Sequence, residues 1–205
     1  MQGFILHVRK ARNEDTIVTV LTPERLETLY RFYGARHPIV TAGFKIDFEI
    51  EREDYRFLPR LRHVIHLGYP WLKEPERLGV WQHVLALLYE HLRGVETPGR
   101  FYYDLLEHYA ALWHLQNPKR AAVEAYLRLL DHEGRLSPPR DCFLCGRPLE
   151  EEIALARAFL PAHPRCVVGP SYPRRALERL FQTAKTTHLE DGDVDRLWLT
   201  LLEGM

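Results

Sequence analysis

Four residues with soft donor atoms carry the strongest chemical signal in this sequence. Cys142 and Cys145 are separated by two residues, and His163 and Cys166 repeat that spacing in the pattern C-x2-C-x17-H-x2-C. Two close pairs of sulfur or imidazole ligands, joined by a longer loop, are typical of a tetrahedral Zn²⁺ site. We therefore predict a zinc ion held by Cys142, Cys145, His163 and Cys166.

Two other interpretations of this pattern are open. The three cysteines of the chain can be reduced thiols without a metal, with Cys166 buried as a small apolar residue, and His163 can be an ordinary exposed loop histidine. A catalytic zinc is disfavoured, because zinc deaminases need His-x-Glu before Pro-Cys-x-x-Cys. Four protein ligands also leave no open coordination position, so we expect the Zn²⁺ to be structural.

A second group of residues combines positive charge with aromatic rings near the N-terminus. The rings are Tyr30, Phe32 and Tyr33, and the basic residues that we predict to contact nucleic acid are Arg9, Lys10, Arg12, Arg31, Arg36 and His37. Cations neutralise phosphates and rings stack on bases. The alternative is that these charges only keep the surface soluble and that Phe32 belongs to the core.

A second basic group, Arg174 and Arg175, lies on a predicted C-terminal helix. We include both residues among the predicted nucleic-acid contacts. The alternative for them is an ordinary solvated helix face.

The rest of the sequence offers no catalytic constellation. Gly-x-Ser-x-Gly, a Walker loop, Gly-x-Gly-x-x-Gly and His-Glu-x-x-His are all missing, so we expect a protein that is not an enzyme. Its 28 basic residues balance 28 acidic ones, which argues against a uniformly basic coat but allows a local basic face. Three cysteines argue against a secreted disulfide scaffold. No apolar run is long enough for a signal peptide or a membrane span, and we expect a soluble cytoplasmic protein.

Strand patterns dominate the first 70 residues. The clearest is 44–51, where apolar and charged residues alternate without a fault. The other predicted strands are 4–9, 16–21, 26–33 and 62–67. Five short strands without a crossover helix predict a small closed barrel of the OB type.

Past Tyr69 and Pro70 the apolar period becomes helical. The predicted helices are 76–93, a second beginning at Thr97-Pro98, a third from Pro118 to Gly134, and two more at 173–185 and 193–203. We therefore predict an α+β protein of two domains. An OB-fold domain spans 1–70, and a helical domain spans 71–205 with a zinc-binding insert at 138–170.

This order of a barrel, helices and a cysteine-bearing insert resembles the RecO family of bacterial DNA repair proteins. Residues 13–23 are similar to the family's acidic stretch, which enters the second strand and ends in Thr-Pro. Residues 34–37 are similar to its small-residue and arginine run after the third strand, and residues 129–146 to its leucine-rich helix leading into Cys-x-x-Cys-Gly. His163 stands where the family usually has another cysteine, although imidazole is a normal zinc ligand.

The resemblance implies an N-terminal OB barrel and a helical domain with a zinc-ribbon-like insert. It also implies a recombination mediator in DNA repair, which binds and anneals single-stranded DNA and helps RecA displace the single-strand binding protein SSB. The implied partners are single-stranded DNA, RecR, RecA and the acidic C-terminal tail of SSB. For that tail we predict contacts at Lys119, Arg120 and Arg128, and we expect the protein to be associated with the nucleoid. The alternative function is a protein–protein adaptor with incidental DNA contact, which the zero net charge and the acidic stretch 47–54 favour.

Overall fold

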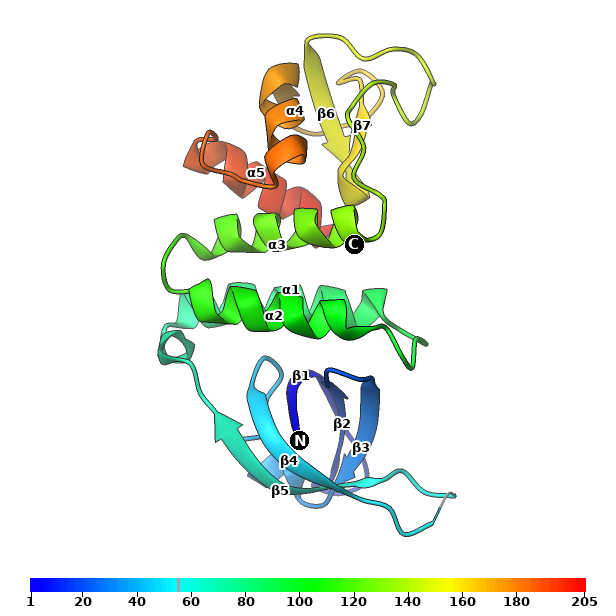
Figure 1. Cartoon of the computed structure of the whole chain (residues 1–205), viewed down its shortest axis with the longest axis vertical. Helices are drawn as coiled ribbons and strands as arrows, with labels where there is room; N and C mark the ends of the chain where they lie inside the picture. Colours follow the sequence, from blue (N-terminus) through cyan, green and yellow to red (C-terminus); the bar gives the residue numbers. More distant parts are fainter. Residues whose placement is uncertain (55) are drawn as a thin grey trace. The chain divides into compact units, whose positions relative to one another are not determined.

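The computed structural model describes residues 1–54 and 56–205, and it separates into two compact units (Figure 1). The first unit is Met1–Leu115 and contains strands β1 to β5 with helices α1 and α2. The second is Gln116–Met205 and contains helices α3 to α5 with strands β6 to β8.

Five strands of the first unit close into a barrel in the order β1-β2-β3-β5-β4. Their bounds are Gln2–Lys10 for β1, Thr16–Leu21 for β2, Leu26–Arg31 for β3, Lys45–Glu51 for β4 and Arg60–Leu67 for β5. All neighbours pair antiparallel except β3 and β5, which run parallel with Tyr30 opposite Arg60. All five predicted strands are present, and this OB-like barrel confirms the predicted α+β class.

The alternating sequence of β4 contributes apolar side chains to the core of the barrel. Ile46 and Phe48 are fully buried in the barrel core with Leu29 and Leu61, whereas Glu49, the next residue of β4, is exposed. Side chains of a strand point alternately to its two faces, so this pattern fixes which face of β4 points inward.

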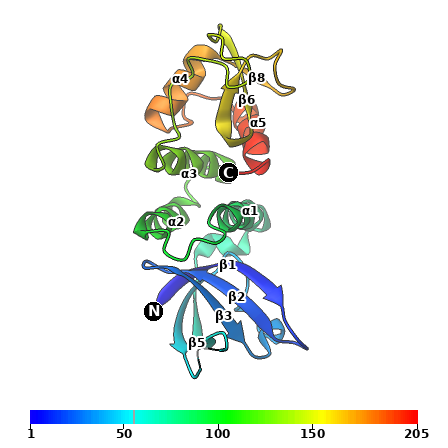
Figure 2. The same ribbon diagram turned by 90° about the vertical axis from the view of Figure 1, so that its right-hand side faces the viewer.

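Helices α1 (Pro75–His91) and α2 (Arg100–Leu112) lie side by side and pack against β1, as Figure 2 shows. A cluster of indole rings joins them to the barrel. The ring centroid of Trp81 lies 5.4 Å from that of Trp71 and 4.9 Å from that of Trp113, and Phe4 of β1 contacts Trp81. The indole N–H of Trp81 donates to the carbonyl of Gly43 at 2.9 Å.

The compact units divide after Leu115, whereas the predicted domain boundary at 70/71 separates the barrel strands from the helices. The barrel strands do end at Leu67. Helix α1 packs Trp81 against Phe4 of β1, and the first compact unit continues to Leu115.

The second unit is built on α3 (Pro118–His132), α4 (Arg174–Thr183) and α5 (Asp191–Leu202). Asn117 caps α3 as predicted, since its side chain accepts a hydrogen bond from the Lys119 amide at 2.9 Å. Gly134, with φ of +67°, follows its end.

A small sheet of three strands lies in the same unit, in the order β7-β6-β8. Its strands are β6 (Glu152–Ala156), β7 (Leu160–Ala162) and β8 (Ser171–Pro173). The sequence did not reveal these strands, because two of them have only three residues and contain proline. Within residues 1–54 and 56–205, none of the helices combines the length and the hydropathy needed to cross a bilayer.

Candidate metal centre and nucleic-acid interface

Two tight turns present the four predicted metal ligands. In the first, the Gly146 amide donates to the Cys142 carbonyl at 2.8 Å, and Gly146 has φ of +67°, a conformation that glycine adopts without strain. In the second, which directly follows β7, the Cys166 amide donates to the His163 carbonyl at 2.9 Å. Each turn therefore directs its two donor atoms to one side.

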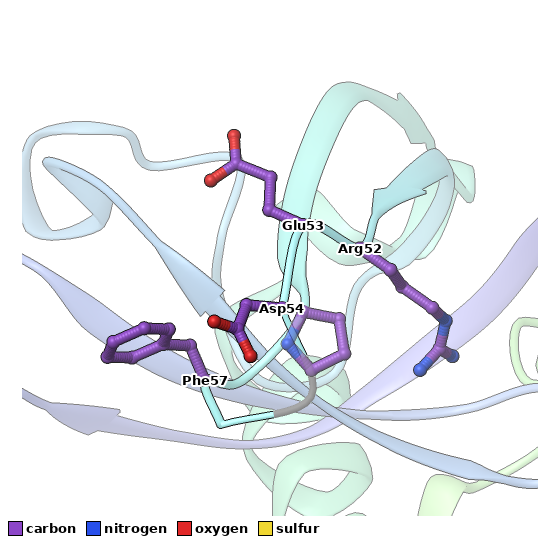
Figure 3. Close-up of a pocket in the computed structure, with 5 residues that line it drawn as sticks. Arg52, Glu53, Asp54 and Phe57 are labelled. Atoms are coloured by element: carbon purple, nitrogen blue, oxygen red, sulfur yellow. The ribbon is translucent and has the colours of Figure 1, made fainter.

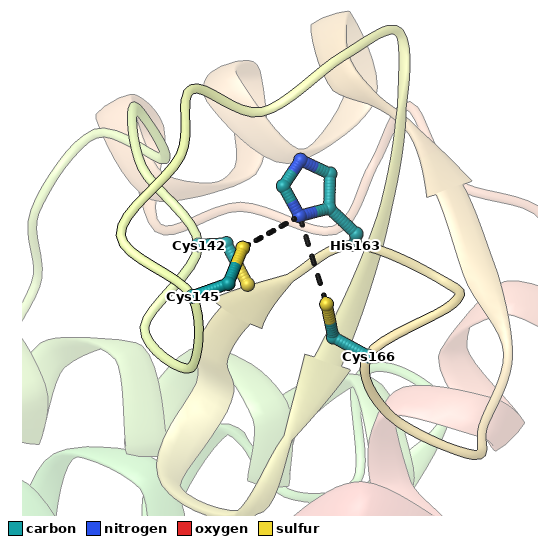
Figure 4. A group of neighbouring side chains, drawn as sticks. All are labelled: Cys142, Cys145, His163 and Cys166. Carbon is teal, nitrogen blue, oxygen red and sulfur yellow. Dashed lines mark hydrogen bonds between the residues drawn. The ribbon is translucent and has the colours of Figure 1, made fainter.

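The donor atoms of the two turns converge, as Figure 4 shows. Nδ1 of His163 lies 3.4 Å from Sγ of Cys145 and 3.8 Å from Sγ of Cys166. All four donor atoms, including Sγ of Cys142, lie within 4.8 Å of one another. Tetrahedral zinc with ordinary bond lengths separates sulfur from nitrogen by about 3.6 Å and sulfur from sulfur by about 3.8 Å. The cluster therefore has the size and the donor set for a metal ion such as zinc.

A carbonyl group orients His163 within this cluster. Nε2 of His163 lies 3.0 Å from the backbone oxygen of Pro148, and the side chain is 2% exposed. An outer hydrogen bond of this kind fixes the imidazole tautomer and leaves the other nitrogen for the metal.

The thiols differ in acidity because their surroundings differ. Burial opposes ionisation of Cys142, but backbone hydrogen bonds from Cys145, His163 and Leu144 lower the pKa of its thiol to about 6. Burial, followed by interactions with Cys142 and Cys145, raises the pKa of Cys166. A divalent cation would compensate the negative charge that accumulates as these thiols ionise.

The predicted nucleic-acid residues of the first unit gather at one end of the barrel. Lys10 pairs with Thr16, Thr16 pairs with Arg31, and Tyr30 pairs with Arg60. This register brings together the loop 11–15, the segment after β3 and the residues 56–59 that precede β5. Arg9, Lys10, Arg12, Arg31, Arg36 and His37 therefore all lie on or beside this end.

Hydrogen bonds join the first two of these segments. Asp15 accepts from the hydroxyl of Tyr30 at 2.5 Å and from the amide of Tyr33 at 2.7 Å, and these two bonds lower the pKa of the Asp15 carboxyl. The Ala35 amide donates to the Glu14 carbonyl at 2.9 Å. Gly34 cannot carry a side chain here, since a Cβ would overlap the hydroxyl of Thr16.

The six predicted residues differ in their exposure and in whether an acidic residue pairs with them. Arg9, Lys10 and Arg12 are exposed and make no ion pair within residues 1–54 and 56–205, and His37 is also exposed. Arg36 forms an ion pair with Glu14. Arg31 is half-buried and donates to the Leu61 carbonyl at 2.9 Å, and burial, aided by the charge of Arg62, lowers its pKa.

Comparison with known families identifies this barrel. Residues 1–72 match the family model described as RecO N terminal. The barrel is therefore similar to the N-terminal domain of RecO proteins. The match confirms the resemblance to the RecO family over this part of the chain, and no curated protein matches the sequence.

The barrel carries further arginines that sequence reasoning missed. Residues 52–62 contain Arg52, Arg56, Arg60 and Arg62, but the acidic residues among them hid this run. The structure pairs them, with Arg60 2.6 Å from Glu53 and Arg62 2.8 Å from Glu51. Arg52, Glu53, Asp54, Phe57 and Pro59 line a surface cavity of about 500 Å³ (Figure 3).

The other predicted residues lie in the second unit, outside the residues 1–72 that match the RecO model. Arg174 donates to the Leu149 carbonyl at 2.7 Å and pairs with Glu178, whereas Arg175 is exposed. The guanidinium of Arg174 thus holds the segment before β6.

The residues predicted for the SSB tail lie on α3. Lys119 pairs with Asp195 at 2.7 Å. Arg120, 18% exposed at its side chain, pairs with Asp191 at 2.8 Å and donates to the carbonyls of Thr186 and Leu189. Both residues tie α3 to the segment around the start of α5, while Arg128 is exposed.

Proposed function

We propose that this protein is a recombination mediator in DNA repair. It binds and anneals single-stranded DNA and assists RecA loading onto DNA coated with SSB, without enzymatic turnover. The observation that carries the proposal is the match of residues 1–72 to the RecO N-terminal model. The RecO resemblance of the later motifs supports the same role.

The chemistry of the barrel end supports a contact with a polyanion. Arg9, Lys10 and Arg12 are exposed cations, and each can neutralise one phosphate. Because many other arginines of this end have acidic partners, the number of phosphates bound is small. Annealing needs no bond to form or break in the DNA backbone, since reduced repulsion between two strands is sufficient.

A structural zinc ion would complete the second unit. Cys142, Cys145, His163 and Cys166 would hold it and would join the turn before β6 to the turn after β7. Metal binding and folding are coupled in small sites of this kind.

The proposed partners are single-stranded DNA, RecR, RecA and the acidic tail of SSB, and the proposed location is the cytoplasm at the nucleoid. Arg128 is the most accessible of the three residues predicted for the tail, because Lys119 and Arg120 already have acidic partners.

Strand annealing tests this function. Two complementary oligonucleotides are coated with SSB, and duplex formation is followed by fluorescence transfer with and without the protein. We expect the protein to accelerate annealing, and the variant Arg9→Ala/Arg12→Ala to lose most of this effect. Arg93→Ala is the matched control. Arg93 is an exposed arginine just after the end of α1, and it pairs with Glu90. Equal rates with and without the protein would contradict the proposal.

A protein–protein adaptor is the second candidate. The zero net charge and the acidic partners of Arg36, Arg60 and Arg62 favour it. A gel shift with a single-stranded oligonucleotide at physiological salt separates the two, because an adaptor gives no shift in the absence of a partner.

A further inference from the structure

Two aromatic side chains at the barrel end are exposed to solvent although specific contacts hold them. Phe32 is 42% exposed and Tyr33 is 57% exposed. Large rings normally gain free energy by burial. Rings held at the surface by specific contacts therefore point to a ligand that covers them.

Each ring is accompanied by a guanidinium group. The Arg60 guanidinium lies over the ring of Phe32, 5.1 Å from its centroid, and the Arg36 guanidinium lies 5.4 Å from the centroid of Tyr33. Tyr30 meets the Phe32 ring nearly at a right angle, with centroids 5.1 Å apart. These contacts fix the orientation of the rings before any ligand arrives.

The backbone at Tyr33 is strained to present its side chain. Its φ of +53° lies in the left-handed region, which a bulky residue rarely adopts. The hydrogen bond from its amide to Asp15 holds this conformation at 2.7 Å. Strain that persists under such restraint is a feature of binding sites.

The charge of this surface indicates which part of a nucleic acid it recognises. Arg36 pairs with Glu14, and Arg60 pairs with Glu53, so neither cation is free for a phosphate. These ion pairs leave open the flat faces of the aromatic rings and of the guanidinium groups. Flat surfaces of this kind stack on nucleobases, and stacking is tolerant of sequence.

We infer that Phe32 and Tyr33, with Arg60 and Arg36 beside them, form a stacking surface for the unpaired bases of a DNA strand. This inference rests on the proposed function and deepens it, because it assigns base recognition to named residues. Duplex DNA hides the faces of its bases, so the surface selects single strands over double strands. The free cations Arg9, Lys10 and Arg12 contact the backbone and do not make this distinction.

The test compares three probes on the full, metal-loaded chain by fluorescence anisotropy. They are oligo(dT) of about 15 nucleotides, an abasic oligonucleotide of the same length, and a duplex of the same length. We expect the wild type to bind oligo(dT) most tightly. Phe32→Leu/Tyr33→Asn removes both rings, and asparagine tolerates the left-handed backbone at position 33.

The double variant should lose about tenfold in affinity for oligo(dT), corresponding to one stacked base, and should bind the abasic strand and the duplex as the wild type does. Phe143→Leu is the matched control, because Phe143 is also exposed, at 43%, but lies in the second unit. It should leave all three affinities unchanged.

A second variant that gains affinity for oligo(dT) keeps the test decisive if the double variant folds poorly. Phe32→Trp enlarges the stacking ring and should tighten oligo(dT) binding without affecting the abasic strand. The stacking surface alone would be overturned if the double variant lost equal affinity for oligo(dT) and for the abasic strand. It would also be overturned if both variants bound oligo(dT) with unchanged affinity. A wild type that binds no single strand would overturn the proposed function as well.

Discussion

Nε2 of His163 lies 3.0 Å from the carbonyl oxygen of Pro148, and this contact determines which ring nitrogen faces the cysteine sulfurs. A carbonyl oxygen only accepts hydrogen bonds, so Nε2 carries the proton. Nδ1 is then the nitrogen with a free lone pair, and it is the atom that lies 3.4 Å from Sγ of Cys145.

His163→Ala should therefore weaken zinc binding on the order of 100-fold, because one of four oriented donors is lost. His163→Cys should keep most of the affinity, since it supplies a thiolate at the same turn. Competition with a chromophoric chelator measures both. Wild-type affinity in His163→Ala would remove this residue from the ligand set.

Removal of the metal should destabilise the second unit and leave the first unit intact. Trp71, Trp81 and Trp113 lie in the first unit and Trp198 lies in the second, so the larger part of the tryptophan fluorescence follows unfolding of the first unit. A chelator, or Cys142→Ser, should lower the temperature of the calorimetric transition of Gln116–Met205. The fluorescence transition should not move. Identical scans with and without chelator would contradict the metal site.

A buried carboxylate in the second unit should be important for its stability. Glu124 is 2% exposed, and it accepts from Lys185 Nζ and from the amide and hydroxyl of Thr186, each at 2.9 Å. Glu124→Ala leaves the buried donors of Thr186 without an acceptor and should cost about 3 kcal/mol in the free energy of unfolding.

Lys185→Ala is the comparison for that variant. The Lys185 side chain is 51% exposed, so its loss should cost about 1 kcal/mol or less in urea unfolding. If both variants had the same small effect, the Thr186 contacts would contribute nothing.

The first unit should lose stability at acid pH through Glu107 of α2. Burial raises the pKa of its carboxyl, but hydrogen bonds from Lys45 and Tyr103 outweigh burial and bring the pKa below the ordinary 4.5. A depressed native pKa stabilises the fold above the unfolded value, and this stabilisation is lost as pH falls through 4.5 toward the native value.

Glu107→Gln should remove this part of the pH dependence, as measured by urea unfolding with tryptophan fluorescence between neutral pH and about pH 3. Glu90→Gln is the control, because Glu90 is an exposed acid on α1 that pairs with Arg93. A Glu107→Gln profile parallel to the wild type would count against the Lys45 contact.

The ion pair between Glu14 and Arg36 should restrain DNA binding. Glu14→Gln frees the Arg36 guanidinium for a phosphate, and the slope of log affinity against log salt should steepen by about 0.7 for a single strand. Arg36→Ala should not steepen it. Anisotropy titrations at several salt concentrations compare the two, and equal slopes in Glu14→Gln and the wild type would contradict this role.

Local sequence patterns predicted the elements well where one face of an element is buried. The alternation over 44–51 and the Asn117-Pro118 cap both led to elements that the structure contains. The spacing of the four metal-site residues also predicted their convergence. In each case the signal lies within a few residues of the chain.

Features that depend on distant residues could not be predicted in this way. The contact of Trp81 with Phe4 joins α1 to the barrel, and no local pattern encodes it. The neutralisation of Arg36 by Glu14 and of Arg120 by Asp191 likewise depends on tertiary placement. Sequence reasoning therefore found the cations but could not tell which of them are free.

The parallel meeting of β3 and β5 has a consequence for how the barrel responds to a ligand. These strands share a single register pair, Tyr30 with Arg60, and the Arg60 guanidinium rests on Phe32 just past the end of β3. This seam has the fewest ladder bonds of the barrel, so its amide hydrogens should exchange fastest with deuterated solvent. A base that stacks on Phe32 and Arg60 would contact both strands and hold them together. Slower exchange of these amide hydrogens would then show that the stacking surface is occupied.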